Sequence, residues 1–321
     1  RSPSRGLGDV YKRQDVLRIF SPATVANVSC GFDAMAFALE TLGDEMVFRK
    51  NDSGKVTISK IEGATLPSDP ANNAAGEVAR LMLASRNSSK GVDIEIYKKY
   101  KPGSGLGSSA ASSAGAAFAM NLLLGEPYNK TEVVSFAMKG EEVACGSQIA
   151  DNVAAAIYGG FVLIRSYEPL DIVSIPTPAR LYATVIHPQI EVKTADARAV
   201  LPKDILLKTG IKQWANVGGL ISGLHSADYE LIGRSLVDGV AEPVRKKFIP
   251  HFDALKEAAM QNEALGAGIS GSGPSVFALS KGRYQAEKIA QAMKDIFKDT
   301  DIACQTYVSK IGENGVRIIN K

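Results

Sequence analysis

A segment rich in glycine and serine, Lys101–Ala111, contains the residue types that a phosphate-binding loop requires. It reads KPGSGLGSSAA, with glycines at 103, 105 and 107 followed directly by two serines. Glycine adopts positive φ easily and lets the backbone approach a ligand closely. If a helix follows, its first amides lack intrahelical acceptors, and the helix dipole favours negative charge there. We therefore expect this segment to hold phosphate groups through its backbone.

The spacing of these residues excludes two well-known phosphate loops. A Walker loop ends in Gly-Lys-Ser/Thr, whereas no lysine follows Lys101 within the segment. A dinucleotide-binding loop has the pattern Gly-x-Gly-x-x-Gly, but the glycines here recur at every second position. An ordinary flexible turn is the simpler alternative. It is disfavoured because a predicted strand precedes the segment and an Ala-rich predicted helix follows it.

The elements that must position this loop can be predicted from hydrophobic periodicity. Residues 92–97 (VDIEIY) alternate apolar and other side chains, which predicts a half-buried strand. Residues 110–124 are rich in Ala, Leu and Met and end at a glycine, which predicts a helix. Thr131 is expected to cap a helix that runs to about Cys145. Further strands are expected at 16–20, 158–165, 181–187, 275–279 and 303–308, and further helices near 204–223, 228–238, 253–264 and 284–297.

Strands and helices interleave along the chain without a fixed repeat. Glycines such as Gly312 and Gly315 indicate antiparallel hairpins, so an α+β fold with two domains is favoured over a doubly wound parallel sheet. A stretch with several prolines places the domain boundary near 165–180. We expect an N-terminal domain over residues 15–170 and a C-terminal domain over residues 171–321.

Composition and charge exclude several classes of protein. The chain has 321 residues, of which 45% are hydrophobic and 22% are charged, unlike a disordered or collagen-like chain. Residues 1–14 lack hydrophobic periodicity and are interpreted as a non-native leader. The rest of the chain carries 33 positive and 33 negative side chains, and this neutral balance argues against a nucleic-acid partner. Three cysteines fit neither a disulfide framework nor a zinc motif. No apolar run approaches the roughly 18 residues of a membrane span, so a cytoplasmic protein with reduced thiols is expected.

Three segments together resemble the motifs of the GHMP kinases, a superfamily of small-molecule kinases. The loop PGSGLGSSAA resembles the second motif of these enzymes. Residues 21–27 (SPATVAN) with the Gly-Phe-Asp of residues 31–33 resemble the N-terminal substrate motif, and residues 268–274 (GISGSGP) resemble the third motif. The resemblance implies an N-terminal domain like ribosomal protein S5, a ferredoxin-like C-terminal domain, and the use of ATP and Mg²⁺.

Within the superfamily, the chain is most similar to the homoserine kinases. That similarity is carried by the phosphate loop and by four further patterns: the N-x(5)-D spacing of residues 27–33; DNVA (151–154) with GGF (159–161); TADAR (194–198) with LP (201–202); and EPVR (242–245) with IP (249–250). Homoserine kinases phosphorylate the side-chain hydroxyl of L-homoserine, a step toward threonine, and we expect that activity here. Homodimers are common among them.

The resemblance also implies which residues contact ATP and Mg²⁺. Ser109 and Glu141 are expected to bind the metal, because Mg²⁺ takes hard oxygen ligands and few of them from protein. The simpler alternative for Glu141 is a solvated pair with Glu142. The residues expected at ATP are those of the loop: Lys101, Pro102, Gly103, Ser104, Gly105, Leu106, Gly107, Ser108, Ser109, Ala110 and Ala111.

The three polar groups of homoserine require three kinds of partner. Asp33 suits the ammonium group, and the guanidinium groups of Arg198 and Arg245 suit the carboxylate. The simpler alternatives are surface ion pairs for the arginines, and turn chemistry around Gly31 for Asn27 and Asp33. The full expected substrate site is Asn27, Asp33, Asp151, Arg198, Arg245 and Gly271. The expected catalytic residues are Ser109, Glu141, Asp151 and Asn152, of which Asn152 would orient the hydroxyl.

No histidine base is evident, because His187, His225 and His251 lie outside every motif. Some superfamily members use an aspartate base, for which Asp151 is the residue to consider. Homoserine kinases are thought to rely on positioning and charge neutralisation instead, which the loose transition state of phosphoryl transfer allows.

Three positions depart from the homoserine kinase pattern. Ile149 stands where histidine is usual, Ala155 where proline is usual and Ala36 where glycine is usual. Isoleucine cannot form a hydrogen bond to a substrate, so these changes could lower affinity or shift substrate choice. Two alternatives therefore stay open: another GHMP kinase acting on a mevalonate-like alcohol, and a catalytically silent GHMP-fold binding protein.

Overall fold

The computed structural model describes residues 15–319, so the leader expected at residues 1–14 lies outside the described residues. The larger of its two sheets has seven strands in the order β11-β1-β2-β4-β3, with β5 pairing to β2 and β6 to β5. Only β3 and β4 pair in parallel among these strands. The strands are β1 (Val16–Ala26), β2 (Met35–Asn51), β3 (Val56–Glu62), β4 (Gly91–Tyr97), β5 (Phe161–Tyr167), β6 (Leu170–Ile175) and β11 (Arg317–Ile318).

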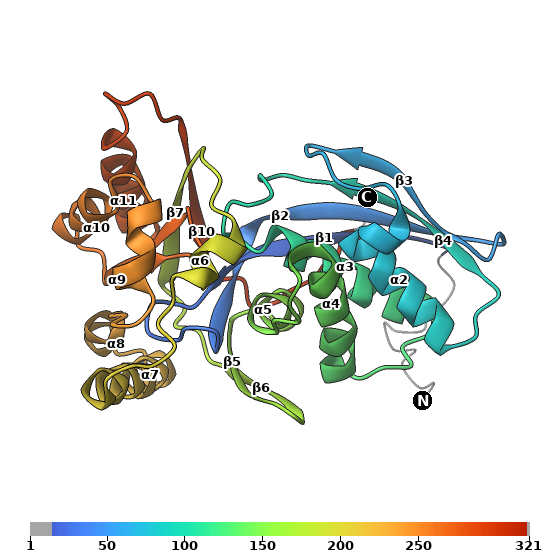
Figure 1. Cartoon of the computed structure of the whole chain (residues 1–321), viewed down its shortest axis with the longest axis horizontal. Helices are drawn as coiled ribbons and strands as arrows, with labels where there is room; N and C mark the ends of the chain where they lie inside the picture. Colours follow the sequence, from blue (N-terminus) through green and yellow to red (C-terminus); the bar gives the residue numbers. More distant parts are fainter. Residues whose placement is uncertain (1–14, 320–321) are drawn as a thin grey trace, which may run out of the picture.

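Four helices pack on one face of this sheet (Figure 1): α2 (Ala74–Ser85), α3 (Ser108–Leu123), α4 (Lys130–Cys145) and α5 (Asp151–Tyr158). The central helix, α3, is buried along most of its length because its side chains are small. At Gly115 an added Cβ would lie 2.8 Å from Met46 Sδ, so the helix backbone rests directly on β2. Close packing of this kind fixes the helix, and therefore fixes the loop at its N-terminus.

The second sheet has four antiparallel strands in the order β10-β7-β9-β8. These strands are β7 (Leu181–Pro188), β8 (Gly266–Ile269), β9 (Val276–Lys281) and β10 (Cys304–Lys310). Helices α10 (Phe252–Gln261) and α11 (Arg283–Asp295) pack against it, and α7 (Leu207–Ser226) packs on α8 (Tyr229–Ser235). Short helices complete the chain: η1 (Pro70–Asn72), α6 (Thr194–Ala199), α9 (Glu242–Arg245) and η2 (Lys246–Phe248). Figure 1 shows α6 at the junction of the two sheets.

The two mainly antiparallel sheets with interleaved helices confirm the α+β prediction. The chain leaves the larger sheet after β6 and enters the second at β7, close to the predicted boundary. It then returns, because β11 pairs with β1. The two-domain division at residue 170 stays a prediction.

Several local predictions were wrong in detail. Gly312 and Gly315 do not form a hairpin, since the flanking strands β10 and β11 belong to different sheets. Gly312 instead lets the chain cross β2 closely: an added Cβ would lie 2.9 Å from the Cα of Glu40. Helix α4 is capped by Asn129, not Thr131, in a capping box with Glu132. The strand expected at 158–165 begins only at Phe161, and the strand expected at 16–20 continues to Ala26.

Candidate active site

A cleft of about 640 Å³ runs past the N-terminus of α3, and segments far apart in the sequence line it. They include the loop between β1 and β2, the C-terminal end of α4, the N-terminal end of α5, and parts of α6 and α9. The structure thus brings together most of the residues expected at the site. Those that line the cleft are Asn27, Asp33, Pro102, Gly103, Gly105, Gly107, Ser108, Ser109, Glu141, Asp151, Asn152, Arg198, Arg245 and Gly271.

Five residues expected at ATP do not line this cleft: Lys101, Ser104, Leu106, Ala110 and Ala111. The side chains of Leu106, Ala110 and Ala111 belong to the hydrophobic cores. The amide of Ala111 donates to the carbonyl of Gly107 at 2.8 Å, so it is not free to hold a phosphate group. The side chains of Leu106, Ala110 and Ala111 instead anchor the loop by packing in the cores. Lys101 is exposed.

The loop glycines are required by conformation and by space. Gly103, Gly105 and Gly107 have φ values of 76°, 80° and 63°. A Cβ at Gly105 would lie 2.6 Å from the carbonyl oxygens of Gly273 and Ser270, and a Cβ at Gly107 would lie 2.1 Å from Thr24 Oγ1. Only glycine fits these two positions, because neighbouring groups press on the loop from both sides.

The three glycine-containing motifs are hydrogen-bonded to one another. The amide of Thr24 in β1 donates to the carbonyl of Leu106 at 3.1 Å. Ser270 Oγ donates to the carbonyl of Gly105 at 2.7 Å, and Asn27 Nδ2 donates to the carbonyl of Gly271 at 2.8 Å. Three motifs that lie between residues 21 and 274 of the sequence therefore form one connected floor of the cleft.

Helix α3 presents its N-terminus to the cleft without a side-chain cap. Its N-cap residue is Gly107, and its first turn contains no acidic side chain. The amides of Ser108, Ser109 and Ala110 therefore have no intrahelical acceptor, and the helix dipole adds positive potential. A phosphate group placed here would meet backbone donors and no negative charge from the helix itself.

Lys98, directly after β4, is a cleft residue that sequence reasoning missed. Its ammonium group forms an ion pair with Asp44, and both side chains are almost completely buried. It also donates to the carbonyl of Ser108 at 2.7 Å. Burial lowers the pKa of Lys98, and the Asp44 carboxylate acts in the opposite direction. No local pattern signals this pair, because its members lie 54 residues apart.

Glu141 faces the first turn of α3 from α4. Its two carboxylate oxygens accept from Ser109 Oγ at 3.0 Å and from Ser113 Oγ at 3.3 Å. Glu141 is buried and Glu142 is exposed, so the alternative of a solvated pair is wrong. Burial raises the pKa of Glu141 to about 7. Glu141 and Ser109 offer hard oxygen donors beside the loop, although residues 15–319 contain no cluster of three or more His, Cys, Asp or Glu suited to a metal.

Asp151 and Asn152 begin α5, and the side chain of Asn152 lies beside Gly107 of the loop. Asp151 Oδ1 accepts from the amide of Asn152 at 2.6 Å and from its Nδ2 at 3.2 Å. Asn152 Oδ1 accepts in turn from Thr24 Oγ1 at 2.7 Å. These contacts fix the amide of Asn152 with its oxygen toward Thr24. Burial raises the pKa of Asp151 to about 7.

The other end of the cleft is charged. Arg198 in α6 donates to both oxygens of Asp33, at 3.0 and 3.2 Å, so these two expected substrate residues pair with each other. Asn27 and Asp33 have φ values of 72° and 53°, and Asn27 Oδ1 accepts from the amide of Asp33, which is the turn chemistry considered above. Both residues also line the cleft, so one arrangement serves the turn and the site.

Arg245 is not a surface residue, since it is only 4% exposed. Its guanidinium donates to the carbonyls of Ala197 and Gly271, at 2.9 and 3.1 Å, and lies over the ring of Phe32. Within residues 15–319 it forms no ion pair with a carboxylate. A buried cation held only by carbonyl groups and an aromatic ring is suited to an incoming anion.

Of the three residues that depart from the homoserine kinase pattern, only one lines the cleft. Ile149 lines the cleft beside Asp151, together with Val143 and Cys145. Ala36 and Ala155 are buried in β2 and α5 and do not line it. None of the three histidines lines it either. At the far end, Leu66, Pro67, Asn72 and Asn73 extend the cleft, and sequence reasoning missed them as well.

Among the helices formed by residues 15–319, none has the length and apolar character to span a bilayer.

Comparisons with known proteins agree with this geometry. The family described as GHMP kinases N terminal domain matches residues 73–160, and GHMP kinases C terminal matches residues 220–299. A homoserine kinase from Chlorobium phaeobacteroides is 48% identical over 94% of this chain and 99% of its own, and one from Pyrococcus abyssi is 37% identical over 92% and 97%. The crystal structure of homoserine kinase from Cytophaga hutchinsonii has a TM-score of 0.92 at 49% identity, covering 96% of this chain and 98% of its own. Mevalonate kinase from L. major, at 18% identity and a TM-score of 0.70 over 91% of this chain and 95% of its own, shares the fold. The chain belongs to the homoserine kinase family of the GHMP kinases.

Proposed function

We propose that the protein transfers the γ-phosphoryl group of ATP to the side-chain hydroxyl of L-homoserine, giving O-phospho-L-homoserine. One observation carries the proposal. A single cleft contains an uncapped helix N-terminus for a polyphosphate and, at its other end, the charged groups Asp33, Arg198 and Arg245 for an amino acid. The kinase activity follows from the family, and these side chains support the choice of substrate.

The phosphate groups of ATP would lie on the loop at residues 102–110, and the far end of the cleft near Leu66 and Pro67 would receive the base. Mg²⁺ fits the oxygens of Glu141 and Ser109, because this cation takes one or two protein ligands beside substrate phosphates. When bound, it would neutralise charge on the phosphate oxygens. Glu141 must be ionised for this role, and a divalent cation nearby favours the ionised form.

A zwitterionic substrate matches the ion pair between Asp33 and Arg198 at the other end of the cleft. The ammonium group of homoserine can replace Arg198 at Asp33, while its carboxylate can replace Asp33 at Arg198 and reach Arg245. The pair is half-exposed in the free protein. Each charge then exchanges one partner for another, so none is left unpaired when the substrate covers it. An alcohol lacking either charge would leave one member of the pair without a partner.

Transfer would rely on alignment of the hydroxyl with the γ-phosphate. Asn152 is held from both sides, by Thr24 and by Asp151, and it would orient the hydroxyl. Asp151 uses one oxygen to hold Asn152, and this supports a positioning role for it. A loose transition state requires no strong general base, because little proton transfer precedes bond cleavage to the leaving group.

A substrate comparison tests the proposal. We expect phosphorylation of L-homoserine, and turnover at least about 100-fold weaker with 3-aminopropanol, 4-hydroxybutyrate, mevalonate or galactose, because each lacks a charge that the ion pair requires. Arg198→Met should raise the homoserine requirement strongly. The matched control is Arg283→Met, which removes an exposed ion pair with Glu287 on α11. Turnover of mevalonate but not of homoserine would refute the proposal, and binding of ATP without any phosphorylated product would favour a silent protein.

A cytoplasmic location stays an expectation from the sequence, and a homodimer stays an expectation from the resemblance.

A further inference from the structure

We infer that Asp238 and Gln213 are positioning residues for the amino-acid substrate, holding Arg245 and the loop of residues 27–33 in one fixed arrangement. Neither residue lines the cleft. The inference rests on the proposed function, because it concerns how that substrate is held. It assigns a role to a polar network that the motifs do not include.

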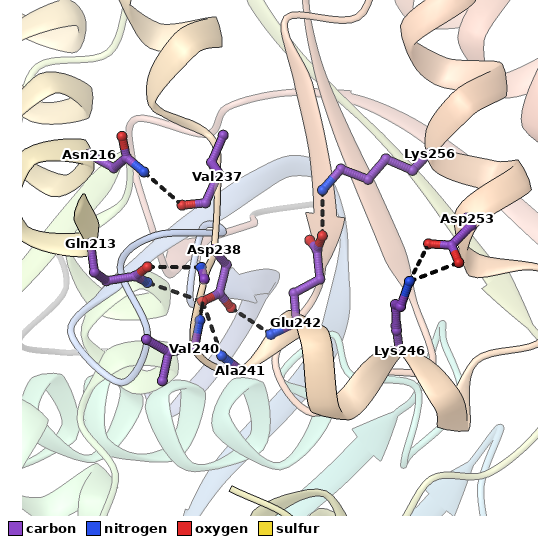
Figure 2. Close-up of polar contacts among 11 residues, drawn as sticks. Gln213, Asn216, Val237, Asp238, Val240, Ala241, Glu242, Lys246, Asp253 and Lys256 are labelled. Atoms are coloured by element: carbon purple, nitrogen blue, oxygen red, sulfur yellow. Dashed lines mark hydrogen bonds and ion pairs between the residues drawn. The ribbon is translucent and has the colours of Figure 1, made fainter. Parts of the chain in front are cut away.

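Asp238 organises the start of α9, the helix that carries Arg245 (Figure 2). Its Oδ1 accepts from the amides of Val240 and Ala241, at 2.8 and 3.1 Å, and its Oδ2 accepts from the amide of Glu242 at 2.8 Å. Helix α9 has only four residues, and no side chain at its N-cap position forms a capping bond. Such a short helix is not stable alone, so its direction depends on the acceptor that Asp238 supplies.

Gln213 joins this turn to the substrate loop. Its Nε2 donates to Asp238 Oδ1 at 3.1 Å and to the carbonyl of Cys30 at 2.8 Å. Its Oε1 accepts from the amide of Gly239 at 3.0 Å. Gln213 is buried in α7, whose side chains Leu220 and Leu224 belong to the hydrophobic core. One buried side chain on α7 therefore bonds to two segments that the sequence separates by about two hundred residues.

The two segments meet again in the cleft itself. Arg245 Nη1 and Asn27 Nδ2 both donate to the carbonyl of Gly271, at 3.1 and 2.8 Å. Contacts on both sides thus set the distance between Arg245 and the 27–33 loop: Gly271 at the substrate side, and Gln213 with Asp238 behind it. Loss of the rear contact should let α9 turn and move the guanidinium away from the substrate carboxylate.

The test compares variants behind the site with a matched control on the same helix. Asp238→Asn keeps one acceptor oxygen but turns an amide donor toward the amide of Glu242. Gln213→Met keeps the length of the side chain and removes all three of its bonds. Each should raise the KM for homoserine about tenfold and leave the KM for ATP and kcat within about twofold, because only the amino-acid end is displaced.

Asn216→Ala is the control. Asn216 lies one turn along α7 and donates to the carbonyl of Val237 at 3.0 Å, so it touches the same loop but neither α9 nor Cys30 (Figure 2). We expect wild-type KM values for this variant. In the Arg245→Lys background, Asp238→Asn should add less than its effect on the wild type, since both changes act through the same guanidinium.

Calorimetric binding of homoserine and thermal unfolding accompany the kinetics. Folded Asp238→Asn and Gln213→Met proteins with a wild-type homoserine KM would overturn the inference, as would equal rises in both KM values. Should Asp238→Asn fail to fold, Gln213→Met decides. A wild-type protein that neither binds nor phosphorylates homoserine would refute the proposed function itself. Normal activity of the wild type together with unaffected variants would refute only the positioning role.

Discussion

Replacing Glu141 by glutamine should stabilise the ligand-free protein while abolishing its activity. Burial raises the pKa of Glu141 from 4.5 to about 7. Such a rise corresponds to about 3 kcal/mol of unfolding free energy lost when the group is ionised. Between these two pH values the folded protein holds a proton that the unfolded chain releases, so stability falls as the pH rises. Glutamine has no charge to desolvate, and its side chain can still accept from one serine.

The measurement is urea unfolding, followed by circular dichroism, at pH 5 and pH 8. Near pH 5 Glu141 is protonated in the folded protein, so its titration should contribute little to the difference in unfolding free energy between the variant and the wild type. At pH 8 Glu141→Gln should be more stable by about 2–3 kcal/mol. Glu142→Gln is the control, because Glu142 lies next along α4 and is exposed. Adding Mg²⁺ and ATP should reverse the order, since only the wild type offers a carboxylate to the cation.

Two results would refute this reasoning. One is a Glu141→Gln protein whose stability relative to the wild type does not change between pH 5 and pH 8. The other is an equal gain in Glu142→Gln, which would show that the overall charge of α4, and not the burial of one carboxylate, sets the effect.

Three further predictions concern the loop and its surroundings. Thr24→Val should lower kcat about tenfold or more with little change in the homoserine KM, because Asn152 loses the donor that fixes its amide. Thr24→Ser keeps the hydroxyl and should have near-normal turnover. An inactive but folded serine variant would contradict this. Ser109→Ala should cut turnover and raise the Mg²⁺ requirement in a titration at fixed ATP; an unchanged Mg²⁺ requirement would remove Ser109 from the metal site. The pKa of Asp151, near 7, predicts that kcat/KM for homoserine falls as the pH drops below about 7 and the carboxyl gains its proton. If Asp151→Asn showed the same fall at low pH, the fall would belong to another group.

Local patterns predicted the elements nearest the chemistry. Alternation over residues 92–97 predicted β4, and the Ala-rich run predicted α3 to within two residues at its start. The loop between them was predicted because glycine spacing and a following helix are both local features. In these elements the local sequence preference agrees with the final structure, so no distant residue is needed to predict them.

Strand β2 could not be predicted in the same way. Its 17 residues include Gly43, Asp44 and Glu45, which interrupt the alternation expected of a strand. Asp44 is buried there because Lys98 pairs with it. Gly43 is required because an added Cβ would lie 2.4 Å from the carbonyl oxygen of Ser21. The exceptions at Gly43 and Asp44 are thus explained by residues on or next to neighbouring strands, which the local sequence does not show.

The candidate site divides along the same line. The identities of Asp33, Arg198 and Glu141 were available from the family resemblance, but their partners were not. The bidentate pair of Asp33 with Arg198 joins residues 165 positions apart, and the bond from Thr24 to Asn152 spans 128 positions. Pairings over such distances are set by the tertiary fold, so a single sequence leaves them open.

The return of the chain to its first sheet has a consequence for how the protein is made. Strand β11 lies beside β1, and Val316, just before it, is buried in the core that surrounds α3. During synthesis, the edge of β1 therefore stays open until residues 317–318 have left the ribosome. The larger sheet cannot be completed early, and a shortened product that stops before Val316 would expose a strand edge that other chains can join.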